Sequence, residues 1–164
     1  MSKLLENRKI IFYDFECLSQ SISPKTGKPY WCVVFIDGET KKKRIIRNDV
    51  QELLKFYALC KDDIFVGYIS RSYDHWIFKG LLLGYCAGRL TTQLIEQGIK
   101  GHNLIRNHNK IKLYNYDAIN KFNSLKQLEA FMGSTIKETD VPFWIDRPIT
   151  DDEELNLIRY CVHD

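Results

Sequence analysis

The chain opens with hydrophobic runs that are typical of strands. Residues 9–15 (KIIFYDF) form a continuous apolar, β-rich run that ends in acidic residues, as in a central strand that opens on a site. Residues 31–37 and 44–46 continue the pattern, and the sequence DGETK at 37–41 contains the Asp-Gly pair favoured in hairpins. We therefore expect these three segments to form an antiparallel meander.

Helical patterns follow the meander. Asn48 or Asp49 can cap a helix that runs to about residue 60, and residues 63–68 (DIFVGY) are another short strand. The elements expected after that are a helix from Asp74 to Leu83 that Gly84 ends, a strand at 111–116, a short helix from Ser124 to Gly133, and a final helix opened by the capping box of Thr150 and Glu153. This order predicts one α/β domain over residues 1–164, with a mixed sheet and helices on its faces.

Composition adds few constraints to this picture. No apolar run approaches the ~20 residues that span a bilayer, and the N-terminus MSKLLENRK lacks the apolar core of a secretory signal. The five cysteines form no C-x-x-C pair, which fits a reducing compartment, so we expect a cytoplasmic protein without membrane contact. Two basic stretches, one at 41–47 and one at 100–112, are either phosphate-facing surfaces or solvated faces.

The first candidate for chemistry is the pair Asp14 and Glu16. Alternation along a strand projects residues i and i+2 to the same side, so the two carboxylates point together. Carboxylates at the end of a core strand are costly unless a cation neutralises them, and Mg²⁺ or Mn²⁺ is the natural partner. Taken alone, the pair is a weak signal that is better explained by a strand end that turns polar at the surface.

Two further acidic positions follow the same order along the chain. Asp74 stands after the strand 63–68 at the start of a helix, where it either faces a site or simply caps that helix. Tyr160 and Asp164 are four residues apart on the final helix and share one face, as also happens in an ordinary amphipathic helix. His163 points about 100° away from Asp164, and the loop residues His102 and His108 lack ligand spacing.

Together the three positions are far more specific than each alone. D-x-E on a first strand, Y-D after a later strand and Y-x-x-x-D on a late helix resemble the DEDDy exonuclease family, and more closely the proofreading domains of phage family-B DNA polymerases. The resemblance spans nearly the whole chain, including SLKQLEAFMG at 124–133 and VPFWIDRPITDDEELNLIRYCVHD at 141–164. Arg159, rather than the histidine of the sibling DEDDh class, stands five residues before Asp164.

The resemblance implies a ribonuclease-H-like fold and a metal-dependent 3′–5′ exonuclease that releases nucleotides from DNA. Its substrate would be single-stranded DNA or a frayed 3′ end, and its partners a polymerase domain or other replication proteins. Lys126 falls where protein-primed polymerases carry a lysine that assists at the scissile phosphate. The residues implied to bind two divalent cations, Mg²⁺ or Mn²⁺, are Asp14, Glu16, Asp74 and Asp164, with Tyr160 positioning the attacking water.

Position 69 departs from the family pattern. Family-B domains usually have G-Y-N shortly before the second-motif aspartate, whereas Gly67 and Tyr68 are followed here by Ile69 and Ser70. The missing asparagine normally contacts substrate, so an alternative function is a catalytically weakened nucleic-acid-binding module of the same fold. An endonuclease or resolvase fits Y-x-x-x-D less well. The residues expected to contact substrate are Phe15, Tyr68 and Tyr73, by stacking on terminal bases, and Ser70, in place of the asparagine.

The last residue, Asp164, lies inside the helix that carries the third motif. Helices commonly continue past such a residue. We therefore expect this chain to be a fragment of a longer phage replication protein, acting in the host cytoplasm.

Overall fold

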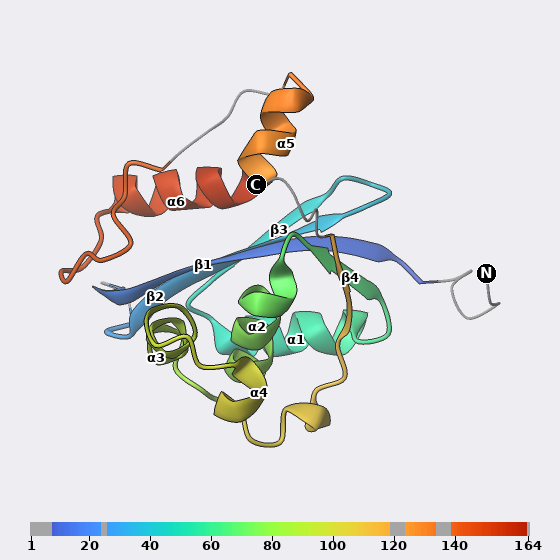
Figure 1. The fold of residues 1–164 in the computed structure, drawn as a ribbon, viewed down its shortest axis with the longest axis horizontal. Coiled ribbons are helices and arrows are strands. Elements are labelled where there is room, and N and C mark those ends of the chain that lie inside the picture. Colours follow the sequence, from blue (N-terminus) through green and yellow to red (C-terminus); the bar gives the residue numbers. More distant parts are fainter. Residues whose placement is uncertain (1–7, 24–25, 119–123, 134–138, 164) are drawn as a thin grey trace.

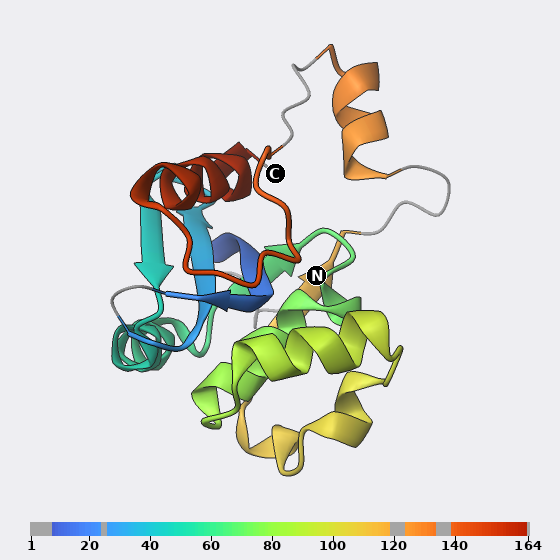
Figure 2. The ribbon, with the colours of Figure 1, turned by 90° about the vertical axis from the view of Figure 1, so that its left-hand side faces the viewer.

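In the part of the chain that the structure describes, the fold is a five-stranded mixed sheet with helices on both faces (Figures 1 and 2). The computed structural model describes residues 8–23, 26–118, 124–133 and 139–163. The strands are β1 (Ile10–Ile22), β2 (Pro29–Asp37), β3 (Lys43–Arg47), β4 (Ile64–Gly67) and β5 (Tyr114–Asp117). The helices are α1 (Val50–Cys60), α2 (Asp74–Leu82), α3 (Ala87–Thr91), α4 (Gly101–Leu104), α5 (Leu125–Phe131) and α6 (Asp151–His163).

The sheet has the order β3-β2-β1-β4-β5. The predicted meander is confirmed, because β2 pairs antiparallel with both β1 and β3. The Asp-Gly turn forms as expected: Asp37 Oδ1 accepts the N–H groups of Glu39 (3.0 Å) and Thr40 (2.7 Å). Strands β4 and β5 extend the sheet in parallel, and β4 pairs with β1 only over Ile10–Phe12.

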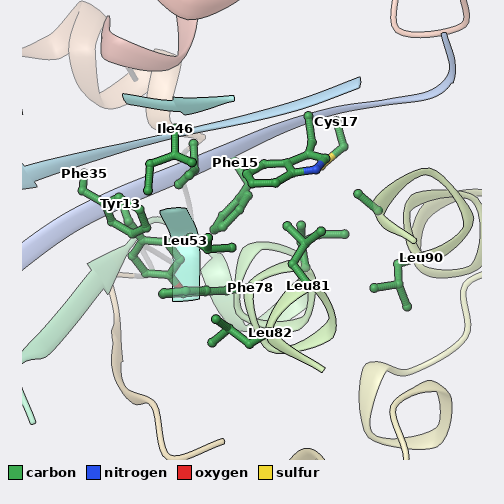
Figure 3. Packing of buried hydrophobic residues seen from close by; sticks show 14 of the residues in the cluster. Tyr13, Phe15, Cys17, Phe35, Ile46, Leu53, Phe78, Leu81, Leu82 and Leu90 are labelled. Atoms are coloured by element: carbon green, nitrogen blue, oxygen red, sulfur yellow. The ribbon is translucent and has the colours of Figure 1, made fainter. Parts of the chain in front are cut away.

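Strand β1 divides two hydrophobic cores because its side chains alternate between the faces of the sheet. Tyr13, Phe15 and Cys17 pack against helices α1 to α3, and Figure 3 shows this cluster around Phe78 of α2. Leu18 lies on the other face, in a second cluster with residues of α6 such as Leu157. The predicted strand 9–15 is therefore only the first half of β1, which continues to Ile22.

The helices expected from sequence are present, with two additions. Asp49 caps α1 by accepting the N–H of Glu52 (2.8 Å), and Gly84 follows α2 with a φ of 82°. The segment between α2 and β5, for which we predicted no element, contains α3 and α4, which are too short to produce a clear helical period. Within the described ranges, no helix is long and apolar enough to cross a membrane.

The predicted capping box at the start of α6 is confirmed. The hydroxyl of Thr150 accepts the N–H of Glu153 (3.2 Å), and the Glu153 carboxylate accepts the N–H of Thr150 (2.8 Å). Arg147 also donates to Glu153 (2.7 Å) and, with the Thr150 N–H, lowers the pKa of that carboxyl to about 2. The first turn of α6, the helix that carries Tyr160, is thus stabilised by contacts among residues close to it in sequence.

Thr150→Ala should lower the free energy of unfolding by about 0.5–2 kcal/mol, because the first turn of α6 loses a partner for one of its N–H groups. Urea unfolding followed by circular dichroism measures the change. Thr150→Ser, which keeps the hydroxyl, is the matched control and should stay near the original stability. Equal stability of the alanine and serine variants would contradict this role.

Candidate active site

The predicted pair Asp14 and Glu16 lies on the α6 side of β1. Their neighbours Tyr13, Phe15 and Cys17 are buried on the opposite face. Both carboxylate residues are half-buried, and the Oδ2 atom of Asp14 is itself buried. The prediction that i and i+2 project together is confirmed by this alternation.

Asp74 lies directly beside this strand. It is the first residue of α2 and is 7% exposed. Its Oδ1 atom accepts the backbone N–H of Phe15 at 3.0 Å. Strand β4 pairs with β1 only as far as Phe12. The Phe15 N–H therefore has no partner on β4 and needs another acceptor, which Asp74 provides. The carboxylate is therefore directed at the peptide that joins Asp14 to Phe15, rather than serving as the cap of α2, which is Tyr73.

Burial sets the charge state of Asp74. Removal from water raises the pKa of its carboxyl to about 7, the Phe15 N–H opposes this shift, and the negative charge of Asp117 adds to it. Such a carboxylate is costly to ionise in isolation and gains strongly from a nearby cation.

Helix α6 brings the third motif to the same strand. Cys161 donates its thiol to the backbone oxygen of Asp14 (3.3 Å), which fixes the end of α6 over the acidic pair. The Lys126 ammonium of α5 lies 5.8 Å from the centre of the Tyr160 ring, so these two predicted site residues are brought together. His163 is partly buried and lies 4.0 Å from Glu129 of α5.

The predicted fourth ligand, Asp164, lies outside the described residues. Among residues 8–23, 26–118, 124–133 and 139–163, no group of three or more His, Cys, Asp or Glu is placed to hold a metal ion. The convergence of all four carboxylates therefore stays a prediction.

Two residues expected to stack on bases belong to the core instead. The Phe15 ring is 2% exposed and lies 5.6 Å from the ring of Phe78. The Tyr73 hydroxyl is 2.8 Å from the Thr91 hydroxyl, and the ring packs against the same core. Alternation along β1 explains the correction for Phe15, since it must face opposite to Asp14. We therefore withdraw both residues as base-stacking groups.

Tyr68 lies in a pocket that also contains Asp14. The pocket has a volume of about 360 Å³ and lies between the sheet and the ends of α5 and α6. Most of the residues that line it are apolar, and among the described lining residues Asp14 is the one that carries a charge. Its lining residues are Phe12, Tyr13, Asp14, Val34, Ile36, Val66, Gly67, Tyr68, Ala118, Leu125 and Cys161.

Ile69 and Ser70 differ sharply in their surroundings. Ser70 is fully buried, and its hydroxyl accepts from the Asn115 amide (3.1 Å). Ile69 is 39% exposed and has a left-handed backbone with φ 52° and ψ 22°. Ser70, expected to contact substrate in place of the asparagine, is thus buried against Asn115, whereas Ile69 lies at the surface. A β-branched residue is strained in this conformation, whereas asparagine tolerates it.

Ile69→Asn should raise the free energy of unfolding by about 1 kcal/mol, because asparagine relieves part of the ~1–2 kcal/mol cost of a left-handed L-residue. Thermal melting measures this gain, and Ile69→Val, which stays β-branched, is the control without one. If the amide also meets substrate, exonuclease turnover should rise several-fold on the same variant. If Ile69→Asn lowers the melting temperature, the inference that Ile69 is strained in the native backbone is wrong.

Asp117 is a neighbour of the site that the sequence analysis missed. It ends β5, and its two carboxylate oxygens accept the N–H groups of Ser70 (2.9 Å) and Arg71 (3.2 Å). These bonds hold the turn that leads from β4 to Asp74. The signal was present, because YNYD at 114–117 ends in an acidic residue as the first strand run does.

Comparison of the chain with protein-family models, curated proteins and solved structures finds no match.

Proposed function

We propose that this chain is a two-metal-ion 3′–5′ exonuclease domain of ribonuclease-H-like fold, acting on the 3′ end of DNA as a proofreading domain does. The observation that carries the proposal is the bond from the Phe15 N–H to Asp74, since it joins the second motif to the strand of the first. A three-stranded meander extended by two parallel strands, with helices on both faces, is compatible with that fold.

The residues present fit divalent cations in character. Asp74 is buried with a raised pKa, and Asp14 has a buried carboxylate oxygen on the adjacent residue of β1. Neighbouring buried carboxylates repel one another unless positive charge is added, and hard cations prefer oxygen ligands. Asp14, Glu16 and Asp74 would hold the ions, with Asp164 as the fourth ligand.

The remaining groups have roles consistent with hydrolysis of a phosphodiester. Divalent ions at such sites supply activation of water and stabilisation of the leaving 3′ oxygen. Tyr160 would orient the attacking water by hydrogen bonding. Lys126 lies beside the Tyr160 ring and would offset phosphate charge there. The pocket next to Asp14 would accept the terminal nucleotide.

Incubation with a 5′-labelled single strand and Mn²⁺ tests the proposal. We expect progressive shortening from the 3′ end, release of mononucleotides, and no reaction in EDTA. Internal fragments would instead assign an endonuclease. Binding of the strand without cleavage in Mn²⁺ would assign the catalytically weakened nucleic-acid-binding module.

A further inference from the structure

The sheet face that carries Asp14 continues beyond the helices as an exposed apolar surface. Helix α6 packs over the second half of β1, around Leu18 (Figure 1). On the first half, Ile10 is 48% exposed and Phe12 is 43% exposed. Phe12 and Asp14 share this face because they are two residues apart on one strand.

Phe12 separates two neighbouring pockets. The first, of about 360 Å³, contains Asp14 and Tyr68. The second, of about 340 Å³, is lined by Ile10, by the basic residues Arg8, Lys9 and Lys41, and by the turn residues Asp37, Gly38 and Glu39. Because both pockets include Phe12, they adjoin along the face of β1, and we call the two together the track, with Asp14 at one end and the basic residues at the other.

The charges at the far end favour an anionic chain. Lys41 and Arg8 supply two of the cations, and Arg8 is held over the Tyr114 ring at 4.1 Å. Of the two acidic residues in this pocket, Asp37 already accepts two turn N–H groups and lies 4.0 Å from Lys9. With Glu39 counted as well, the pocket has three cations against two carboxylates, an excess of one positive charge.

The same row of the sheet offers a second exposed aromatic ring. Phe12 pairs with Val66, and Val66 pairs with Tyr116 on β5, which is 64% exposed. Exposed aromatic rings on a sheet, bordered by cations, match the chemistry of single-stranded nucleic acids, whose bases stack and whose phosphates need positive charge.

We propose that this track binds the single strand upstream of its 3′ end, with a base stacked on Phe12 and phosphates near Arg8 and Lys41. The inference rests on the proposed function, because it places the terminal nucleotide in the pocket at Asp14. It also gives the two basic stretches different roles. The stretch at the β2–β3 hairpin borders the bound nucleic acid, whereas the segment after α4, which includes Lys110, belongs to the layer on the side of the sheet opposite to α6 (Figure 1).

Fluorescence anisotropy with a labelled oligothymidylate in EDTA, where cleavage cannot occur, measures binding directly. Phe12→Ala should weaken binding about 5- to 150-fold, the range for loss of one stacked base, and Phe12→Trp should retain it. Lys41→Ala should lower the slope of log K against log salt by about 0.7, as for one lost phosphate contact on a single strand, and Lys110→Ala should leave it unchanged.

Hydrolysis of the p-nitrophenyl ester of thymidine 5′-phosphate separates binding along the track from catalysis at the acidic site. This substrate has no upstream nucleotide, so Lys41→Ala, at the basic end of the track, should retain its hydrolysis while losing affinity for the oligonucleotide. Equal losses with both substrates would overturn the proposal. If the unsubstituted protein does not hydrolyse the ester but binds the oligonucleotide in a Phe12-dependent way, the proposed nuclease activity is refuted. The proposal that the track binds single strands is then retained.

Light scattering on the same variants tests whether a second copy of this chain, rather than nucleic acid, binds this face. Self-association that Phe12→Ala abolishes, together with oligonucleotide binding that it leaves unchanged, would overturn the proposal and assign the face to a second copy of this chain. We expect no dependence of mass on Phe12.

Discussion

Replacing Asp14 by alanine should abolish 3′–5′ degradation while the protein stays folded. Asp14 directly precedes Phe15, whose N–H binds Asp74, and in the proposed site it is a direct ligand of the cations. Loss of a group that merely supports a metal ligand typically costs about 10–100-fold in activity, so loss of a ligand should cost more. Digestion of a 5′-labelled single strand in Mn²⁺ measures the rate.

The stability of Asp14→Ala should equal or exceed that of the original protein when divalent ions are absent. Clustered carboxylates repel one another, and the substitution removes one of them. Asp62→Ala, at an exposed carboxylate in the turn after α1, is the matched control and should change neither rate nor stability. Nuclease activity that survives in a purified Asp14→Ala protein would rule out the assignment.

Asp74→Asn should make the protein more stable at pH 8 and catalytically inactive. The folded protein keeps the Asp74 proton up to a pKa of about 7, whereas in the unfolded chain the proton leaves near 3.8. Because the folded state binds more protons between these values, its stability falls as pH rises through that window. The total loss for this group is at most about 4 kcal/mol.

The asparagine variant avoids this loss because an amide carries no charge and its oxygen can still accept the Phe15 N–H. In EDTA, we expect a gain of a few kcal/mol (~2–4) at pH 8 and little difference at pH 4, measured by urea unfolding at both values. Mn²⁺ should then stabilise the original protein and not Asp74→Asn, since metal binding to the folded state adds to stability. A gain that is the same at both pH values would show that ionisation of Asp74 is not its source.

Local patterns were enough to predict the strands, the longer helices and the side of β1 to which Asp14 and Glu16 point. Turn and cap chemistry acts within a few residues, so the hairpin at Asp37, the cap at Asp49 and the capping box at Thr150 could be identified from sequence. The two-residue period of a strand likewise placed Asp14 and Glu16 on one face. The α/β class followed from the order of these elements.

Only the tertiary structure determined how separate elements meet. The period of β1 turns Phe15 away from Asp14, but its burial depends on Phe78, which lies in a helix distant in sequence. Asp74 reaches β1, 59 residues earlier, because β4 stops pairing at Phe12. Ile69 adopts its left-handed backbone where Asp117 of another strand holds the next two N–H groups. Such contacts depend on which strands become neighbours, and no local period of apolar residues encodes that.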